Sequence, residues 1–453
     1  MLQTTNFLLI VIQIIQTDMS LYEPADGLLG THVTWHDVEM EMQRVLGTNA
    51  RFGENRKIRD IGDMKGFMSK IAMIQADWYF PPDEDLRSLP DRIAVKMSSE
   101  LSLYNFSTLV SSKKWDVEKM QSMTSHVKDL HNREVQMYRI ISREQPNCPT
   151  VHVLALEEFT EFTPLKAYII SEYIPNLHDI GMSDNIPLDD IWAVVDGIAA
   201  FSAMGESMSE EEKKTATNGD RYIEDAISCF YGENVSGRGI GAVDESFEFQ
   251  PPDNMRKNLV DILGVAYEEK VDEAMEVFDF YCKNSEIRSN YSKVPEFLDH
   301  NPVLMHSDIW PSNLLFSRSP QNNLEFEALI DFQTASMSSP GLDVACLMVT
   351  CLSKTDRRAC KGALLDRYYE SFVRSLKNPN SIPYTRSQLE DSYDLCFPAA
   401  VILMLPFILS FSLRLGDDIP ENSIDKSAGL IEDFIFIHKS NLQKFPKFYE
   451  TRL

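Results

Sequence analysis

The chain has 453 residues, of which 43% are hydrophobic and 25% are charged, a balance typical of a folded globular protein and not of a disordered one. Its 43 lysines and arginines stand against 69 aspartates and glutamates, which gives a formal net charge of −26 at pH 7. A surface this acidic repels nucleic-acid backbones and anionic lipid, and no basic patch interrupts it. We therefore expect no nucleic-acid partner.

The cysteines predict the redox environment. There are seven, an odd number, and none forms a C-x-x-C pair. This argues against a zinc knuckle and against a disulfide framework. Reduced, mostly buried thiols are expected instead, which favours a cytoplasmic location.

The N-terminus carries an apolar run, Phe7–Ile15. No lysine or arginine precedes it, and Gln16, Thr17 and Asp18 follow it where a secretory signal would place small residues. We interpret residues 1–18 as an extension outside the fold, with a working signal peptide as the alternative. The first domain is then expected over residues 19–174.

Two apolar runs in the first domain predict strands, Lys70–Trp78 and Ile93–Met97. The turn Gly62–Ser69, which contains Gly66, precedes the first run. In the second run, strand alternation places Ile93, Val95 and Met97 on one face, and Ala94 and Lys96 on the other.

Residues 123–142 predict a helix. Its apolar stripe consists of Val127, Leu130, Tyr138 and Ile141, and Glu134 lies on the same stripe. A carboxylate that faces a core needs a cation, and Lys96 is the candidate; a surface Glu134 is the alternative. The runs Val151–Glu157 and Ala167–Tyr173 then predict two more strands, and a hinge follows near Glu172–Pro175.

After Pro175 the patterns become long and helical, which predicts a second domain over residues 175–453. The polar stretch 205–220 and the Gly- and acid-rich stretch 232–252 predict loops, and residues 364–376 predict one amphipathic helix. Leu395–Leu413 has the length of a membrane span. Because Pro398 and Pro406 interrupt it and acidic residues flank it, we interpret it as a buried core helix and expect no membrane span.

A short β-rich island at residues 303–331 carries the strongest chemical signal. It contains LMHSDIWPSNLLF at residues 304–316, which is followed by ALIDFQ at residues 328–333. The apolar flanks place Asp308 and Asn313 on a loop between strands, and alternation along Leu324–Asp331 turns Asp331 away from the apolar face. Phosphoryl transfer requires such a carboxylate beside the attacking hydroxyl and oxygen ligands for Mg²⁺.

These motifs resemble the H-G-D-x-W-x-x-N and I-D-[FW]-Q patterns of the CHK-kinase-like, ecdysteroid-kinase-like family. That family belongs to the protein-kinase-like superfamily, with the choline and aminoglycoside kinases. Here Ser307 replaces the usual glycine. The resemblance implies an α+β, bilobal protein-kinase-like fold with a small β-rich N-lobe and a larger, mainly helical C-lobe.

The resemblance also implies roles for individual residues. Asp308 would be the catalytic base, Asn313 and Asp331 the Mg²⁺ ligands, and His306 a structural prop of the loop. Asp343, in the G-x-D element, would cap the next helix and brace the catalytic loop.

Further roles follow in the small lobe, where Ile93-Ala94-Val95-Lys96 matches the V-A-I-K strand of kinases. Ala94 would leave room for adenine, and Lys96, paired with Glu134, would face the phosphates. Gly66 and Ser69 would line a phosphate turn, and the hinge from Glu172 to Ile174 would offer backbone groups to adenine. The glycine-rich Gly237–Gly241 is interpreted as a flexible loop.

The leading hypothesis is an ATP- and Mg²⁺-dependent kinase that phosphorylates a hydroxyl of a small alcohol, which the resemblance suggests is steroid-like or xenobiotic. Gly341 follows Asp331 by only ten residues, too few for the activation segment of a kinase with protein substrates. The alternative is a catalytically silent kinase-fold protein that binds nucleotide or a partner. Neither the acceptor nor the oligomeric state can be read from the sequence.

Overall fold

The computed structural model describes residues 20–62, 68–82, 88–102, 117–217, 252–413 and 419–450. They form two compact units. The first holds the described residues up to Val135 together with Val151–Pro175, and the second holds Gln136–Thr150 and the described residues from Asn176 onward. The predicted N-terminal extension and Gly66 lie outside the described residues.

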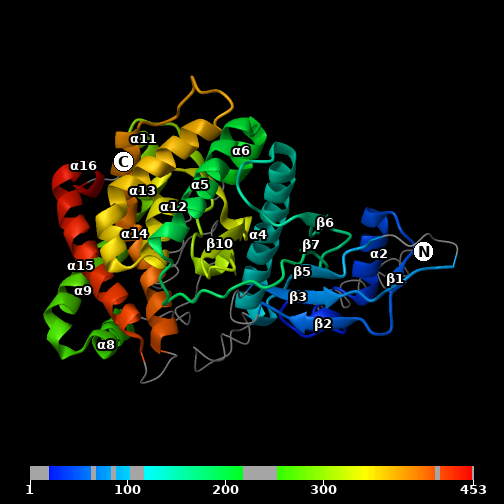
Figure 1. Cartoon of the computed structure of the whole chain (residues 1–453). Coiled ribbons are helices and arrows are strands. Elements are labelled where there is room, and N and C mark those ends of the chain that lie inside the picture. Colours follow the sequence, from blue (N-terminus) through cyan, green and yellow to red (C-terminus); the bar gives the residue numbers. More distant parts are fainter. Residues whose placement is uncertain are drawn as a thin grey trace, which may run out of the picture. The chain divides into compact units, whose positions relative to one another are not determined.

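A five-stranded antiparallel sheet organises the first unit, with strand order β2-β3-β5-β7-β6 (Figure 1). Its strands are β2 (Lys57–Asp60), β3 (Ser69–Gln75), β5 (Arg92–Ser98), β6 (Val153–Glu157) and β7 (Tyr168–Glu172). The predicted run to Trp78 ends early because Asp77 has a positive φ of 50°. After this turn, β4 (Trp78–Tyr79) forms a separate antiparallel pair with β1 (Arg51–Phe52).

One face of this sheet packs on helix α2 (Trp35–Leu46), preceded by the 3-10 turn η1 (Leu28–Gly30). Thr34 and Asp37 form a capping box at the start of α2, and Gly47 ends the helix in the left-handed conformation. Val38 and Met42 of the helix join the apolar side chains of β5 and β7 in one core cluster.

Helix α4 (Val117–Glu144) continues from the first unit into the second. The predicted stripe is buried along its whole length, at Val127, Leu130, Tyr138 and Ile141. Its C-terminal part, from Gln136, belongs to the second unit together with the loop to Thr150.

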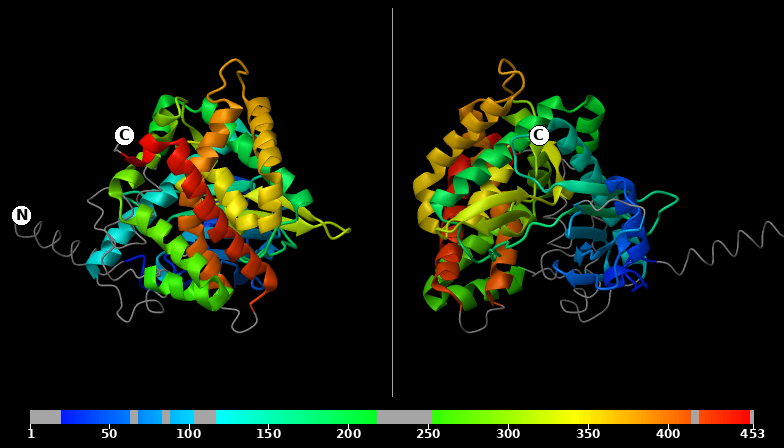
Figure 2. Two further views of the ribbon diagram at one scale, coloured as in Figure 1. Left: turned by 90° about the vertical axis from the view of Figure 1, so that its left-hand side faces the viewer. Right: turned by 45° about the vertical axis from the view of Figure 1, so that its right-hand side comes forward.

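Long helices form most of the second unit: α5 (Leu188–Met204), α12 (Gly341–Cys351), α13 (Lys354–Ser375), α14 (Arg386–Leu413) and α15 (Glu421–Lys444). Figure 2 shows α15 running beside α14 and α9 (Glu268–Cys282), which it contacts. The other helices of this unit within the described residues are α6 (Glu210–Thr217), α8 (Pro252–Leu263), α10 (Ser285–Asn290), α11 (Val294–Phe297) and α16 (Pro446–Glu450), with 3-10 turns η2 (Gly205–Ser207), η3 (Val265–Tyr267) and η4 (Tyr291–Lys293).

Among the described helices, α14 alone is long and apolar enough to cross a membrane. Of its 18-residue apolar window, 83% is buried inside the protein, where the helix packs on α12 and α15. Both Pro398 and Pro406 lie within the helix and are buried.

Two short antiparallel pairs complete the second unit. β8 (Val303–Met305) pairs with β11 (Ser336–Ser338), and β9 (Leu314–Arg318) pairs with β10 (Leu324–Leu329). The 3-10 turns η5 (Pro311–Asn313) and η6 (Phe332–Thr334) lie between these strands. The two pairs therefore hold the ends of the loops that carry Asp308 and Asp331.

The prediction of a loop over residues 205–220 is wrong, because η2 and α6 occupy most of the described part of this stretch. Ser209 and Glu212 form reciprocal bonds at the start of α6: the Glu212 N–H donates to Ser209 Oγ, and the Ser209 N–H donates to Glu212 Oε2. This capping box stabilises a helix despite its polar composition.

The predicted α+β, kinase-like fold class is confirmed: an N-terminal antiparallel sheet is followed by a largely helical region. All six described cysteines are free thiols, and five of them are buried.

Candidate active site

The first group of candidate residues lies on β5 and α4 in the first unit. As predicted, Ile93, Val95 and Met97 are buried toward α2, whereas Ala94 and Lys96 lie on the opposite face and are half-buried. Lys96 Nζ donates to Glu134 Oε2 over 2.7 Å. The Glu134 side chain is only 1% exposed and that of Lys96 17%, so the pair is largely removed from water.

A histidine fixes the helix that carries Glu134. His131, one turn earlier on α4, has Nε2 at 2.8 Å from the carbonyl oxygen of Glu157 on β6. Burial lowers the pKa of His131 to about 4, so the ring is neutral at physiological pH and donates its Nε2–H to that carbonyl. This hydrogen bond links α4 to β6, the edge strand of the sheet, and so helps to orient the Glu134 side chain toward β5.

The other residues of this unit that are predicted to bind nucleotide lie on β3 and at the end of β7. Ser69 is buried at the start of β3, opposite Ser98 of β5. The Glu172 N–H donates to the His152 carbonyl, so this hinge amide is already committed. Within the described ranges, the Ile174 N–H donates to no backbone carbonyl, which makes it the better hinge donor for a ligand.

The second group surrounds the loop between β8 and β9 in the second unit. His306 is fully buried, and its Nε2 lies 2.9 Å from the carbonyl oxygen of Ile330. Its Nδ1 accepts the Asp308 N–H at 3.3 Å. Because a carbonyl only accepts and an N–H only donates, the ring is neutral with its proton on Nε2. His306 therefore props the loop, as the resemblance implied.

Asp308 is half-buried and holds a dense set of polar contacts. Asn313 Nδ2 donates to the Asp308 carbonyl oxygen at 2.9 Å and to its Oδ2 at 3.0 Å, and Trp310 Nε1 donates to the same Oδ2 at 3.2 Å. Burial and the nearby Asp331 carboxylate raise the pKa of Asp308 to about 7, against the opposing effect of these donors. A carboxylate with such a pKa suits proton transfer near neutral pH.

Asp331 reaches its position by a route that strand alternation did not predict. A register shift between Phe326 and Ala328 interrupts β10, and the strand ends at Leu329. Asp331 follows with a left-handed backbone, φ 68°, at the start of η6. The prediction of one alternating strand to Asp331 is therefore wrong, because the bulge changes which side chains share a face.

Asp343 braces the loop from α12. Its two carboxylate oxygens accept the backbone N–H groups of His306 and Ser307, each at 2.8 Å. Burial raises its pKa to about 6, although the two amides oppose the shift. The predicted bracing role is present, but the predicted capping is not, since Pro340 occupies the N-cap and Asp343 lies inside the helix.

Aromatic side chains form the apolar support beneath this loop. Phe332, which follows Asp331, is fully buried and has its ring centroid 5.2 Å from the His306 ring and 5.1 Å from that of Phe201 on α5. Tyr138 of α4 makes an edge contact with the same Phe332 ring at 5.2 Å. The loop of Asp308 is therefore packed on buried aromatic side chains.

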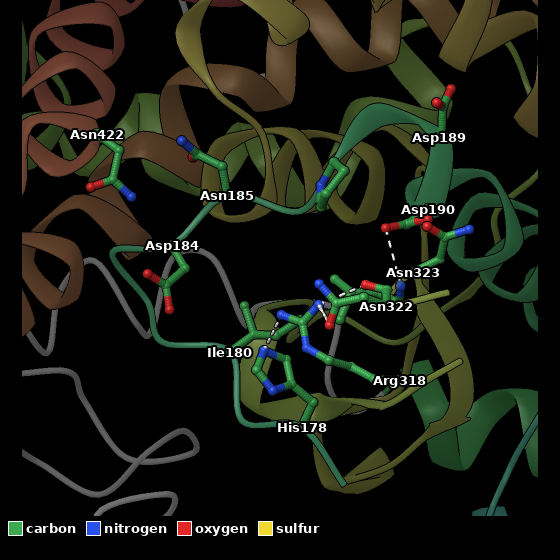
Figure 3. A pocket seen from close by; sticks show the side chains of 12 residues that line it. His178, Ile180, Asp184, Asn185, Asp189, Asp190, Arg318, Asn322, Asn323 and Asn422 are labelled. Atoms are coloured by element: carbon green, nitrogen blue, oxygen red, sulfur yellow. Dashed lines mark hydrogen bonds between the residues drawn. The ribbon is translucent and has the colours of Figure 1, made fainter. Parts of the chain in front are cut away.

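A polar pocket of about 580 Å³ lies at the other end of the β9–β10 hairpin (Figure 3). Arg318 Nη2 lies 2.8 Å from His178 Nε2, and Asp190 Oδ2 accepts the Leu324 N–H at 3.2 Å. Four residues of β9 separate Arg318 of this pocket from Asn313, and the five steps span roughly 16 Å of extended chain. The pocket is therefore remote from the loop of Asp308, and its polar lining does not resemble a steroid site.

The donor atoms fit a magnesium–nucleotide complex. Asn313 directs its Nδ2 at Asp308, which leaves its Oδ1 as the amide's acceptor, and Asp331 supplies a carboxylate. In the described part of the chain, no group of three or more His, Cys, Asp or Glu side chains is arranged for a metal ion. Mg²⁺ beside a triphosphate needs only one or two protein carboxylates or carbonyls, because phosphate and water oxygens complete its shell.

The sequence interpretation missed two contributors. Trp310 lies in the motif, but only the structure reveals that its indole N–H bonds to Asp308. Ser336 contacts Ser307 from a separate strand, β11, and no local pattern connects the two positions.

Comparison with known proteins places the chain in a family. Residues 21–442 match the model of the DUF1679 family, described as "Uncharacterized oxidoreductase dhs-27". An uncharacterized kinase-like protein of Caenorhabditis elegans is 31% identical over 143 residues, which are 32% of this chain and 35% of that protein. The chain thus matches about a third of that relative's length.

Solved structures with a related arrangement are more distant. The GDP complex of aminoglycoside 2′-phosphotransferase-IIIa is 13% identical, covers 89% of this chain and 98% of its own, and has a TM-score of 0.39. An aminopropanol kinase associated with a microcompartment is 10% identical, covers 90% of this chain and 98% of its own, and has a TM-score of 0.38. The ethanolamine kinase of Plasmodium vivax is 10% identical, covers 85% of this chain and 83% of its own, and has a TM-score of 0.35. These scores are too low to assign an activity.

Because the family model covers nearly the whole chain, this protein belongs to the DUF1679 family, which is CHK-kinase-like. The resemblance found from the motifs is thereby confirmed.

Proposed function

We propose, from its membership in this kinase-like family, that the protein transfers the γ-phosphoryl group of ATP to a hydroxyl of a small alcohol. The observation that carries the proposal is the contact of Asn313 with Asp308 on a loop braced by Asp343. A solvated loop carboxylate needs no such set of donors, whereas a general base must be oriented.

In this proposal each residue has one task. Asp308 orients the acceptor hydroxyl and takes its proton, and Asn313 keeps the carboxylate in place. Asn313 Oδ1 and Asp331 would hold Mg²⁺. Bound Mg²⁺ would neutralise charge that develops on the transferred group.

The first unit would supply the nucleotide contacts. Lys96, oriented by Glu134, would bind phosphate oxygens. Ala94, on the same face of β5, would accept the adenine ring, and Ser69 would donate to a phosphate. Ile174 N–H would be the hinge donor. We also propose a cytoplasmic location, from the free thiols.

The family description mentions an oxidoreductase, and the fold does not favour nicotinamide chemistry. A dinucleotide-binding domain needs a parallel sheet with a glycine-rich turn at its switch point. Every strand pair of the described sheets is antiparallel. The remaining alternative is the silent kinase fold, which Ser307 in the catalytic loop favours.

A turnover assay separates these alternatives. Purified protein would be incubated with Mg²⁺, either ATP or GTP, and a panel of alcohols that includes steroids, sugars and amino alcohols. Mass spectrometry would then detect a phosphorylated acceptor. We expect a product that depends on the acceptor and is lost in Asp308→Asn. Nucleotide binding without any product across the panel would favour the silent alternative. In a parallel incubation with NAD⁺ and the same alcohols, NADH formation would contradict both.

A further inference from the structure

Ser307 has a backbone conformation that its side chain disfavours. Its φ is 69°, in the left-handed region, and the residue is fully buried directly before Asp308. Glycine adopts this region freely, whereas a residue with a Cβ does so only where the surroundings fix it. A glycine is usual at this position of the family pattern. The chain therefore needs a compensating contact here.

The compensating contact is a pair of buried hydroxyls. Ser307 Oγ lies 2.9 Å from Ser336 Oγ, and Ser336 is only 1% exposed. Ser336 begins β11, where it pairs with Met305 at the end of β8. One hydroxyl donates and the other accepts inside the core, so removing either side chain leaves the other hydroxyl buried without this partner.

This pair belongs to a set of bonds between the loop of Asp308 and the segment after β10. His306 reaches the Ile330 carbonyl, and Thr334 Oγ1 donates to the His306 carbonyl at 3.0 Å. The serine pair adds a third connection, at the residue that immediately precedes Asp308. Ser307, which leads directly into Asp308, is thus held at its backbone N–H by Asp343 and at its hydroxyl by Ser336.

We propose that Ser336 is a positioning residue, which holds Ser307 in its left-handed conformation and thereby orients Asp308. The inference rests on the proposed kinase function. It explains how the chain tolerates serine where the family pattern has glycine. It also predicts that removing the Ser336 hydroxyl disturbs the orientation of Asp308 only when residue 307 is a serine.

The test is a cycle of variants: Ser336→Ala, Ser307→Gly and the double variant. Three properties are measured for each: unfolding in urea, hydrogen–deuterium exchange of residues 304–309, and kcat with the nucleotide KM. A matched control is Ser183→Ala, since Ser183 and Ser412 form another buried hydroxyl pair in the second unit, at 3.1 Å.

Ser336→Ala should accelerate exchange in residues 304–309 and lower kcat about fivefold, the effect of one ordinary hydrogen bond, with the nucleotide KM unchanged. Adding Ser307→Gly should restore both properties, because glycine needs no brace. Ser183→Ala should weaken resistance to urea to a similar extent and leave kcat and loop exchange as in the parent.

Three outcomes would overturn the proposal: no rescue by Ser307→Gly, loop exchange unaffected by Ser336→Ala, or equal loss of kcat in Ser183→Ala. A parent protein without turnover would instead refute the proposed function. In that case loop exchange in the four variants still decides whether Ser336 holds Ser307.

Discussion

The pKa of Asp308 is set by opposing effects of its neighbours. Burial and the Asp331 carboxylate raise its pKa to about 7, while Trp310 and Asn313 stabilise the ionised form. The motif spacing predicted Asp308 and Asn313 on one loop, and they are in contact. It did not predict Trp310 as a donor, because the direction of an indole depends on backbone angles that residue type alone does not fix.

The two acidic residues of the site should respond differently to the loss of charge. Asp308→Asn keeps the size of the side chain but cannot accept the hydroxyl proton, so kcat should fall about 10²- to 10⁴-fold with Mg·ATP affinity near that of the parent. Asp331→Asn should lower both, because a metal ligand supports nucleotide binding as well as chemistry. Calorimetric titration with steady-state kinetics measures the contrast. Full activity of Asp308→Asn on a verified acceptor would refute the mechanism.

Asp343 gives a pH-dependent prediction. Its pKa is raised from 3.8 to about 6, so the folded state binds the proton more tightly than the unfolded state does. Its contribution to stability is therefore full below pH 4 and is lost as pH rises through about 6. The amide that replaces this carboxyl group in Asp343→Asn does not titrate.

The stability of the parent relative to Asp343→Asn should thus fall by about 3 kcal/mol between pH 4 and pH 7, following roughly 1.4 kcal/mol per pKa unit. Urea unfolding of both proteins at each pH measures this difference, in which the titration of groups that Asp343 does not influence cancels. A difference that stays constant with pH would show that the carboxylate of Asp343 is not perturbed.

At the scale of elements, periodicity predicted β5, α4 and α13 well, because each presents one apolar face to a core. It failed where local geometry departs from the regular period. The bulge in β10 changes the face of the residues after Phe326, and the capping box at Ser209 stabilises α6 in a polar sequence. The serine–glutamate spacing of that box was visible in the sequence and could have predicted the helix.

The ion pair between β5 and α4 should be essential to the first unit. Lys96→Met leaves Glu134 buried without this cation, which should cost about 3 kcal/mol of unfolding free energy. It should also reduce the increase in Tm produced by Mg·ATP. Lys96→Met with Glu134→Gln should recover much of the stability but not the response to nucleotide.

Lys70→Met is the matched control on the neighbouring strand. Lys70 pairs with Asp60 at 3.2 Å, with exposed side-chain fractions of 20% and 28%, so its removal should cost under about 1 kcal/mol. Equal losses in Lys96→Met and Lys70→Met would contradict the distinction between a pair whose carboxylate is fully buried and a pair whose carboxylate is part-exposed. Thermal unfolding with and without Mg·ATP measures both effects.

For the whole molecule, the motifs identified the family and the fold class, since both depend on residues at fixed spacing. The allocation of residues 136–150 to the second unit was not predictable in the same way. Helix α4 continues without interruption through Val135, and its apolar stripe runs through both parts, so no change of composition marks the boundary. Only the contacts of Tyr138 and its neighbours assign this part of the helix.

The predicted extension is tested by shortening the chain. A chain that begins at Met19 should keep the parent's Tm and solubility, because it retains Leu21, which is buried with Val127, Phe159 and Ala167. A chain that begins at Thr34 keeps the cap of α2 but lacks Leu21 and Leu28, and each lost core leucine should cost about 2–5 kcal/mol. Its Tm should therefore fall by more than about 5 °C. Differential scanning calorimetry compares the three proteins, and a large loss of Tm on removing residues 1–18 alone would place part of that segment in the fold.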